Sequence, residues 1–486
     1  MKQQYIAAID GGTQSTKVSL FDTQGHIVCT HSVALREIHL YGQSRAEHPD
    51  DDVWDSLQQA CRGMLEKFPG DRRDIIGIGL GSIRCCRALI KEDGTLASAI
   101  QSWMDIRLSH PYEHTDDEVR YVTTATGYLT HRLTGMAKDT RANYVGPWPI
   151  DPETLQWYPD GPLFDSYTTP RDKLFELVDP ATVLGTLTQR ASEATGFLAG
   201  TPVIATANDK AVEGLGAGLM DPCTALVSLG TYITGMMVGT TYESSATQYW
   251  SNPGAVKGEF LYESNGIRRG MATITWIKDL MGPALIEEAK AQNLTPEAYL
   301  NVLASKVPAL CDGLYTILHW LALPSQPWQR GIMIGFQGHH KGEHMFRSVM
   351  EGICMTMQGH VQAMCQERNV PLKHLIVSGG GSNGDLFMQI MADVFGVPAY
   401  RNEVNESASM GAAICTALAL GVYPDKATAV EHMVRCRDIF IPDEKHVALY
   451  NRINKEVYSK ISKATEDILQ TSHQIFQEIG IDQTPC

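Results

Sequence analysis

The chain begins with a pattern of apolar runs separated by short polar turns. A strand-like run, Tyr5–Asp10, leads directly into the polar, glycine-rich stretch Gly11–Lys17. A second apolar run covers Val18–Phe21, and after a turn at Asp22–Gly25 a third run covers His26–Val33. Short apolar runs bounded by turn residues are typical of neighbouring β-strands. The pattern predicts a β-hairpin whose tip carries glycine, threonine and serine, followed by a third strand.

The same arrangement recurs near the start of the second half of the chain. An apolar run at Ala225–Leu229 meets Gly230 and Thr231, and a further run follows at Ile233–Val238. The copies are too diverged to count as a sequence repeat, but a duplicated strand–tip–strand unit is a stronger signal than either copy alone. Two such hairpins facing each other across a cleft would clamp one polyphosphate from both sides.

Elsewhere, strand-like runs alternate with helical patterns. Apolar residues from Val53 to Leu65 recur at helical spacing, and Pro69-Gly70 ends that helix. Alternation of this kind predicts an α/β fold rather than an all-β fold or a helical bundle. The other predicted elements are strands at 75–80, 88–90, 202–207, 375–377 and 398–400, helices at 346–366, 384–395 and 409–420, and a terminal amphipathic helix or pair at 450–476.

The length of the chain, 486 residues, is more than one hydrophobic core normally supports. The glycine-rich segment 214–218 precedes the second hairpin, so we expect a boundary near Leu219–Asp221. The predicted domains are residues 1–219 and 220–486.

Composition narrows the classes of function. The net charge of −15 argues against nucleic acid or an anionic membrane surface as the main partner. No apolar stretch approaches the roughly 20 residues of a membrane span, and Asp10 interrupts the first apolar run, so we expect no signal peptide. The eleven cysteines include no CxxC pair, which favours a reduced, cytoplasmic enzyme.

The first hairpin tip has the chemistry of a phosphate site. Asp10 ends a strand and would hold Mg²⁺ through water, while the backbone at Gly12 and the hydroxyls of Thr13 and Ser15 would donate hydrogen bonds to a phosphate. Lys17 completes this set of predicted phosphate-binding residues. The alternative is an ordinary hairpin with a polar tip, because glycine pairs are common in hairpin turns.

A carboxylate lies at the junction of a predicted buried strand and a helix, in the sequence Asn208-Asp209-Lys210. Such junctions lie at the edge of α/β sheets where catalytic residues collect. The alternative is that Asp209 is only the helix N-cap, the commonest role of an aspartate at this position. The spacing alone favours the N-cap.

A second glycine-rich turn, Gly379–Asp385, lies between a predicted strand and helix and suits the close approach of a nucleotide. It is neither a Walker A loop, because no Gly-Lys-Ser/Thr follows, nor GxGxxG. The alternative is a tight strand–helix turn. The residues predicted to contact the nucleotide are Gly380, Gly381 and Asn383.

The loop Gln101–Arg107 brings an aromatic residue, Trp103, close to an acid, Asp105. This pair suits a polyol, because a carboxylate accepts hydrogen bonds from hydroxyls and an aromatic ring packs on a C–H face. The alternative, favoured for the loop by itself, is a surface loop with one ion pair. Arg84 and Arg87 could reach the same site. His339-His340 could suggest a metal, although solvated loop histidines are the more common case.

The order of these motifs resembles that of the FGGY carbohydrate kinases, the group that includes glycerol kinase and xylulokinase. The resemblance covers nearly the full length through DGGTQSTK, AEHPDDDVW, SWMDIR, TANDKAVEGLGAG, SLGT, GIMIGFQGHHKGEHMFRSVMEG, SGGGSNGDLFMQIMADVFGVP and ESASMGAA. It implies two actin-like, ribonuclease-H-type domains around a catalytic cleft, with ATP and Mg²⁺ as cofactors and a small sugar or polyol as substrate.

The resemblance also implies residue roles. Asp10 matches the magnesium and phosphate site, Gly230 and Thr231 match the second phosphate loop, and Asp105 matches a sugar-contacting acid. Asp209 matches the catalytic aspartate, which reverses the preference for an N-cap. The leading hypothesis is therefore an ATP-dependent kinase of a ketose- or pentulose-like sugar or a polyol, with Asp209 as the general base; a homodimer is left open.

Three departures bear on the substrate. Arg84-Cys85-Cys86 replaces a Met-His-Gly sequence, Asn208 and Lys210 flank the catalytic acid in place of the usual residues, and the stretch 110–119 is shorter than in the family. Arg84 favours a substrate with a carbonyl or carboxylate oxygen or a dense row of hydroxyls over plain xylulose, unless it pairs with a nearby acid. The alternative function is a catalytically weak or inactive actin-like regulator that binds sugar or nucleotide.

Overall fold

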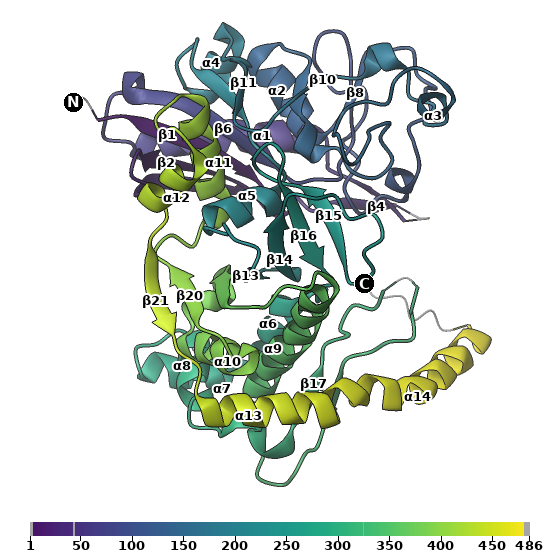
Figure 1. Cartoon of the computed structure of the whole chain (residues 1–486), viewed down its shortest axis with the longest axis vertical. Coiled ribbons are helices and arrows are strands. Elements are labelled where there is room, and N and C mark those ends of the chain that lie inside the picture. Colours follow the sequence, from purple (N-terminus) through teal and green to yellow (C-terminus); the bar gives the residue numbers. More distant parts are fainter. Residues whose placement is uncertain (1–2, 42–43, 324, 481–486) are drawn as a thin grey trace.

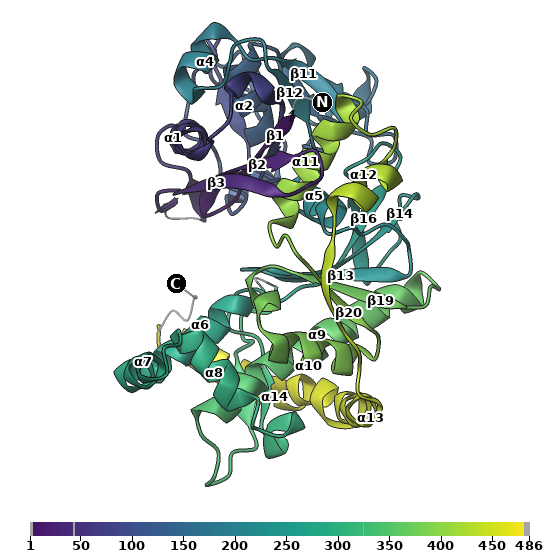
Figure 2. The ribbon, with the colours of Figure 1, turned by 90° about the vertical axis from the view of Figure 1, so that its left-hand side faces the viewer.

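The computed structural model describes residues 3–41, 44–323 and 325–480 and forms two lobes, each built on a mixed β-sheet (Figures 1 and 2). The first sheet has six strands in the order β11-β12-β6-β1-β2-β3. These strands are β1 (Tyr5–Gly11), β2 (Ser15–Asp22), β3 (Ile27–Ala34), β6 (Ile75–Ser82), β11 (Thr182–Thr186) and β12 (Pro202–Ala205).

The second sheet has seven strands in the order β15-β16-β14-β13-β19-β20-β21. They are β13 (Thr224–Leu229), β14 (Ile233–Gly239), β15 (Tyr249–Pro253), β16 (Phe260–Ser264), β19 (His374–Ser378), β20 (Ala399–Asn402) and β21 (Cys436–Phe440).

The two sheets share one topology. In the first, β1 pairs antiparallel with β2 and parallel with β6, and β12 continues parallel before the antiparallel edge strand β11. In the second, β13 pairs antiparallel with β14 and parallel with β19, and β20 continues parallel before the antiparallel strand β21. The duplication predicted from the two hairpins therefore extends to the whole sheet.

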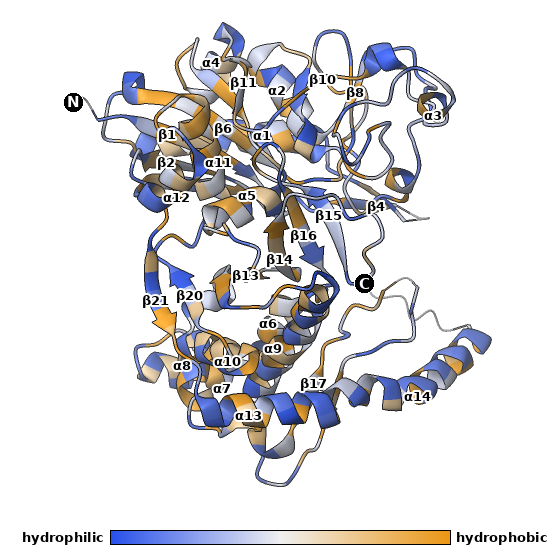
Figure 3. Cartoon of the chain, in the orientation of Figure 1, coloured by the Kyte–Doolittle hydropathy of each residue, from blue (hydrophilic) through white to orange (hydrophobic). Residues whose placement is uncertain are grey.

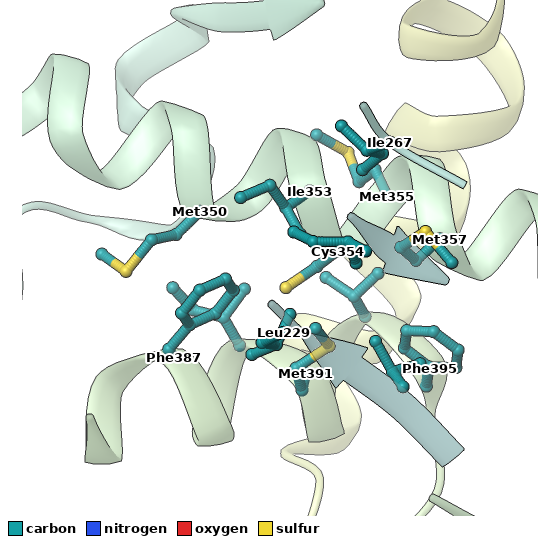
Figure 4. Close-up of a cluster of buried hydrophobic side chains, with 14 of the residues drawn as sticks. Leu229, Ile267, Met350, Ile353, Cys354, Met355, Met357, Phe387, Met391 and Phe395 are labelled. Carbon is teal, nitrogen blue, oxygen red and sulfur yellow. The ribbon is translucent and has the colours of Figure 1, made fainter. Parts of the chain in front are cut away.

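The helices predicted from apolar periodicity are present. α1 (Asp52–Lys67) buries Val53, Leu57 and Met64 against the first sheet and ends immediately before Phe68. In the second lobe, α9 (Gly342–Glu367) and α10 (Asp385–Phe395) turn their apolar faces toward each other, and Figure 4 shows Ile353 and Met391 among these side chains. The helical spacing of apolar residues thus predicted which face is buried.

Two helices join the lobes at very close range. α5 (Asp209–Gly216) packs on α11 (Ser407–Ala419), where a Cβ atom at Gly216 would lie 1.9 Å from the Ser407 carbonyl oxygen. A Cβ atom at Gly411 would lie 1.9 Å from the Val212 carbonyl oxygen. Only glycine allows this approach of the two backbones.

Helix α11 belongs to the second half of the chain but packs on the first sheet. A Cβ atom at Gly79 of β6 would lie 2.5 Å from the Ala412 carbonyl oxygen, and α12 (Lys426–Met433) follows on the same side (Figure 1). The predicted boundary near Leu219–Asp221 falls between α5 and β13 and stays a prediction. The sequence did not predict that the later helices return to the first lobe.

The remaining elements complete the two lobes. The terminal segment forms α13 (Glu444–Ile453), a π-helical turn (Asn454–Tyr458) and α14 (Ser459–Glu478), which confirms the predicted pair, and α13 shows alternating blue and orange bands in Figure 3. None of the helices in the described ranges combines the length and apolar character that a bilayer span requires. The other elements are β4 (His39–Tyr41), β5 (Arg45–Glu47), β7 (Ala88–Ile90), β8 (Tyr121–Thr123), α2 (Ala125–Thr134), β9 (Lys138–Thr140), α3 (Pro162–Asp165), β10 (Glu176–Val178), α4 (Gln189–Thr195), α6 (Gly270–Leu280), α7 (Gly282–Ala291), α8 (Pro296–Ala304), β17 (Tyr315–Ile317) and β18 (Ile332–Ile334).

Candidate active site

The first hairpin tip lies between β1 and β2 and is a tight turn. The Gly12 N–H donates to the Ser15 carbonyl oxygen at 2.9 Å, and Thr13 at the tip is exposed. Next to the tip, a Cβ atom at Gly11 would lie 2.8 Å from the Ser82 hydroxyl at the end of β6. The tip therefore presents backbone and hydroxyl groups at the edge of the sheet, as the sequence predicted.

Asp10 lies one residue before this tip, paired across the hairpin with Lys17. Burial, and then the negative charge of Asp209, raise the pKa of Asp10 to about 6, although Lys17 opposes the shift. Asp209 is thus close enough for its charge to raise the pKa of Asp10. A carboxylate whose charged form is disfavoured in this way favours a bound cation.

Asp209 is not the N-cap of α5. The cap is Asn208, whose Oδ1 accepts from the Ala211 N–H at 3.0 Å while its Nδ2 donates to the Ala142 carbonyl oxygen at 3.1 Å. Oδ1 of Asp209 is buried and has no hydrogen-bond partner among the residues that the structure describes. Asn208 therefore caps the helix, and the Asp209 carboxylate is available for another role.

Arg84 follows β6 and is the cation beside Asp209, with Nε 4.0 Å from Oδ1 of that residue. Its Nη2 donates to Glu263 of β16 at 2.8 Å. Arg84 thus pairs with an acid, the alternative left open by the sequence, while it also faces Asp209. Arg87 points elsewhere, since it donates to the His110 carbonyl oxygen at 2.8 Å.

The second hairpin tip, Gly230 and Thr231, lies against the glycine-rich turn. Gly379 has a positive φ of 83°, and a Cβ atom there would lie 2.5 Å from the Leu229 carbonyl oxygen. Asn405 holds the turn, since it accepts from the Gly379 N–H and donates to the Gly379 carbonyl oxygen, both at 3.1 Å. The two predicted nucleotide loops therefore form one surface.

Gly380 and Asn383 on this turn are exposed, whereas Gly381 is buried against Leu229. A Cβ atom at Gly380 would meet nothing within 4 Å, so the backbone there is open to a ligand.

A buried polar network ties α5 to the second sheet. Glu213 accepts from the Ser378 hydroxyl at 2.6 Å and from Lys210 Nζ at 2.8 Å, and Lys210 also donates to Ser228 at 3.0 Å. Ser228 and Ser378 lie at or near the carboxyl ends of β13 and β19. The network thus holds the helix that carries Asp209 beside the strand ends that carry the nucleotide loops.

The predicted sugar loop is arranged differently from the expectation. Asp105 is buried, and its oxygens accept from the Ala46 N–H at 2.8 Å and from Arg107 Nε and Nη2 at 2.9 and 2.7 Å. Burial raises its pKa, but these hydrogen bonds, with Arg107 first, outweigh burial and lower it. Trp103 is 46% exposed. Asp105 forms an ion pair, as the alternative interpretation of the loop predicted. That Asp105 contacts a sugar remains an untested prediction.

Reasoning from sequence missed Glu263, Glu213 and Asn405. Glu263 carried a usable signal, because it is a charged residue inside the otherwise apolar strand β16 and is fully buried. Buried charges are expected to be paired. Its partner Arg84 was singled out from the sequence, but the pairing was not predicted, because 179 positions separate the two residues.

The histidine pair lies outside this site. Asp312, His339 and His344 place one ligand atom each within 4.8 Å of one another on an exposed surface. Nδ1 of His340 accepts the Gln337 N–H and Nδ1 of His344 accepts the Lys341 N–H, which leaves the proton of each neutral ring on Nε2. His339, whose Nε2 lies 3.3 Å from Oδ2 of Asp312, is the member of the histidine pair that belongs to this cluster.

Solved structures with the same fold are sugar kinases. A gluconate kinase from Lactobacillus acidophilus aligns with a TM-score of 0.81 at 20% identity, covering 96% of this chain and 99% of that chain. A ligand-bound xylulose kinase from Lactobacillus acidophilus aligns with a TM-score of 0.81 at 19% identity, covering 95% of this chain and 98% of that chain. The fold is the two-domain actin-like fold of carbohydrate kinases, as predicted.

Sequence comparison defines the family. The N-terminal domain of the FGGY family of carbohydrate kinases matches residues 5–118 and its C-terminal domain matches residues 225–420. A protein named uncharacterized sugar kinase YgcE from Escherichia coli (strain K12) is 49% identical over 481 residues, covering 99% of this chain and 98% of that protein. A xylulose kinase from Lactococcus lactis is 23% identical over 523 residues, covering 97% of this chain and 99% of that protein.

The molecule is thus a carbohydrate kinase, an enzyme that uses ATP to phosphorylate a sugar. The chain belongs to the FGGY family, and the recognition made from its motifs is confirmed.

Proposed function

We propose that this kinase phosphorylates a hydroxyl of a small ketose, pentulose-like sugar or polyol, with Asp209 as the general base and Mg²⁺ on the transferred phosphate. The observation that carries the proposal is the buried Oδ1 of Asp209 at the start of α5, which accepts no hydrogen bond among the described residues. A general base must be free to accept a proton from the attacking hydroxyl. Asp209 has that freedom because Asn208 caps the helix.

The residues around Asp10 fit a magnesium ion. Mg²⁺ prefers oxygen ligands, keeps several waters and is commonly held by one or two carboxylates together with substrate phosphates. Asp10 supplies such a carboxylate beside the Gly12–Ser15 tip, and its pKa is raised first by burial and then by the charge of Asp209, which a bound cation would offset. The ion would neutralise charge on the γ-phosphate during transfer.

The nucleotide is assigned to the surface formed by both hairpin tips and the glycine-rich turn. Gly12, Thr13 and Ser15 would face the transferred phosphate from the first lobe. From the second lobe, Gly230 and Thr231 would hold the phosphates and the turn at 380–383 would approach the adenosine. Lys17, 3.9 Å from Glu406, would contribute positive charge near the first tip.

The acceptor sugar is assigned to the space bordered by Arg84, Trp103 and Asp209. Cys86 lies between the Trp103 backbone and Asp209: burial and the charge of Asp209 raise the pKa of its thiol, and the backbone N–H of Trp103 lowers it. Relatives named xylulose kinase and glycerol kinase support a ketose or polyol.

The test is a coupled ADP-release screen over ketoses, polyols and sugar acids, followed by Asp209→Asn. The variant should keep its fold and its binding of Mg-ATP, while turnover falls by roughly 10²-fold or more, the usual scale of a lost general base. Glu444→Gln is the matched control, because Glu444 also occupies the first position of a helix but lies on exposed α13.

Wild-type turnover in Asp209→Asn would overturn the assignment of the base. Retained nucleotide binding with no turnover on any acceptor would instead favour the alternative of an inactive sugar- or nucleotide-binding regulator.

A further inference from the structure

Arg84 and Glu263 form an ion pair that joins the two lobes. Arg84 comes from the segment after β6 of the first sheet, and Glu263 lies on β16 of the second sheet. Nη2 of the arginine lies 2.8 Å from each carboxylate oxygen of Glu263. Glu263 is fully buried, and its Oε2 also accepts from the Asn252 amide at 3.2 Å.

The pair fixes the charge next to the proposed base. Burial alone would lower the pKa of Arg84, but Glu263 and then Asp209 outweigh it and raise the pKa, so the guanidinium stays charged. Its positive charge faces two carboxylates, one at 2.8 Å and one at 4.0 Å. The three side chains together therefore carry one net negative charge.

A cation already held by a buried carboxylate is a poor partner for a second carboxylate. A sugar acid would bring its negative charge beside Asp209 without an unpaired cation to receive it, and like charges brought together at an interface are strongly unfavourable. The hydroxyls of a neutral acceptor meet no such penalty and still find hydrogen-bond donors on Arg84 and an acceptor on Asp209.

We infer that Glu263 is a specificity-determining residue, which neutralises Arg84 so that the acceptor site takes uncharged ketoses or polyols and rejects sugar acids. The inference rests on the proposed function of this site. It also removes the carboxylate-bearing substrates from those that Arg84 alone suggested. The fold does not decide the matter, since a gluconate kinase shares it.

The experiment compares two acceptors with the same carbon skeleton, D-sorbitol and D-gluconate, and a second pair, xylitol and xylonate. Binding is measured by calorimetry or thermal shift with Mg-ADP present, and turnover by ADP release. The wild type should bind the neutral member at least roughly 10-fold more tightly, the scale expected for one misplaced charge. Tighter binding of the sugar acid by the wild type would overturn the inference without any variant.

Glu263→Gln should shift the ratio of the two affinities toward the sugar acid by roughly 10-fold or more, because Arg84 then loses the carboxylate at 2.8 Å that neutralises it. The double variant Arg84→Gln with Glu263→Gln carries the same net charge as the wild type around Asp209, and the preference for the neutral acceptor should return. A purely structural role of Glu263 would not give this reversal.

Glu259→Gln is the matched control. Glu259 precedes β16 of the second sheet and pairs at 2.6 Å with Lys426 of α12, a helix on the side of the first lobe, so this variant also breaks an ion pair outside the acceptor site. Its affinity ratio should equal that of the wild type. A folded Glu263→Gln with an unchanged ratio would sink the inference. Binding and turnover are measured separately. Tighter binding of the neutral acceptor without any turnover would therefore support the inference about Glu263 and contradict the proposed function.

Discussion

The two sheets share a strand order over six strands, with β15 added at the edge of the second, yet they carry different side chains at equivalent positions. β1 of the first sheet carries Asp10 one residue before its end at Gly11, whereas β13 of the second ends in Leu229 followed by Gly230. The helix after β12 begins with Asp209, whereas the helix after β20 begins with Ser407. Both copies carry a tip with glycine and hydroxyl groups, but at these two positions the first copy has carboxylates and the second has Leu229 and Ser407. In the proposed function, the first copy supplies the acidic, reacting side of the site and the second copy supplies the side that cradles the nucleotide.

The comparison of the two sheets depends first on the contact between α5 and α11, which joins the lobes. Gly411→Val should lower the free energy of unfolding by about 3 kcal/mol or more, because the new side chain would meet the Val212 backbone and neither helix can yield without shifting a sheet. Chemical denaturation measures the loss. Gly359→Ala in α9 is the control, since its Cβ would meet nothing within 4 Å, and it should be neutral or stabilising by up to about 1 kcal/mol.

The acidic side should be under electrostatic strain when no metal is bound. Asp10 titrates near 6 in the fold against an ordinary value of 3.8, so the stability from this group is present at low pH and lost as pH rises to about 6. With EDTA at pH 8, Asp10→Asn should therefore be more stable than the wild type by about 2 to 3 kcal/mol. At pH 4 the gain should vanish.

Mg²⁺ sharpens that prediction. Added Mg-ATP should stabilise the wild type more than Asp10→Asn and so shrink or reverse the difference. Asp139 is the control, because burial raises its pKa to about 7 in the first lobe away from the hairpin tips, and Asp139→Asn should respond to Mg-ATP as the wild type does. Equal responses of wild type and Asp10→Asn would refute the magnesium assignment.

A substitution on the side proposed to bind the nucleotide should weaken the affinity for ATP rather than slow phosphoryl transfer. Asn405→Ala removes the two hydrogen bonds to Gly379 and should raise KM for ATP by roughly 10-fold with little change in kcat. Steady-state kinetics with ATP varied measures this. Asn402→Ala nearby removes only the bond to the Ala217 carbonyl oxygen at 3.0 Å and should leave KM for ATP unchanged. A matching fall in kcat for Asn405→Ala would mean that the two sides are not separate.

The smallest effect on catalysis is expected at Asp105. Its oxygens accept hydrogen bonds from Ala46 and Arg107. Asp105→Asn should therefore lower the free energy of unfolding by about 1 to 2 kcal/mol but change KM for the acceptor by less than roughly 3-fold. A KM increase above roughly 10-fold would show that this residue contacts the sugar after all.

Local patterns predicted what depends on neighbours in the chain. The hairpin tips, α1 and α9 follow from the spacing of apolar and turn residues, and Asp209 was found at its strand–helix junction. The partner of Arg84 could not be found, because Glu263 lies 179 positions away and pairs only after both sheets have formed. For Asp105, the ion pair with Arg107 two positions away could be predicted, whereas the hydrogen bond from Ala46, 59 positions earlier, could not.

The placement of α11 bears on how the protein is made. The face of β6 at Gly79 is covered by Ala412, so the first lobe has no complete core until most of the chain has left the ribosome. Until then this lobe has an exposed apolar face. Partly folded chains of this kind bind chaperones and are prone to aggregate. A fragment ending near Leu219 would remain in that condition permanently, and folding is in this sense a property of the whole chain rather than of either half.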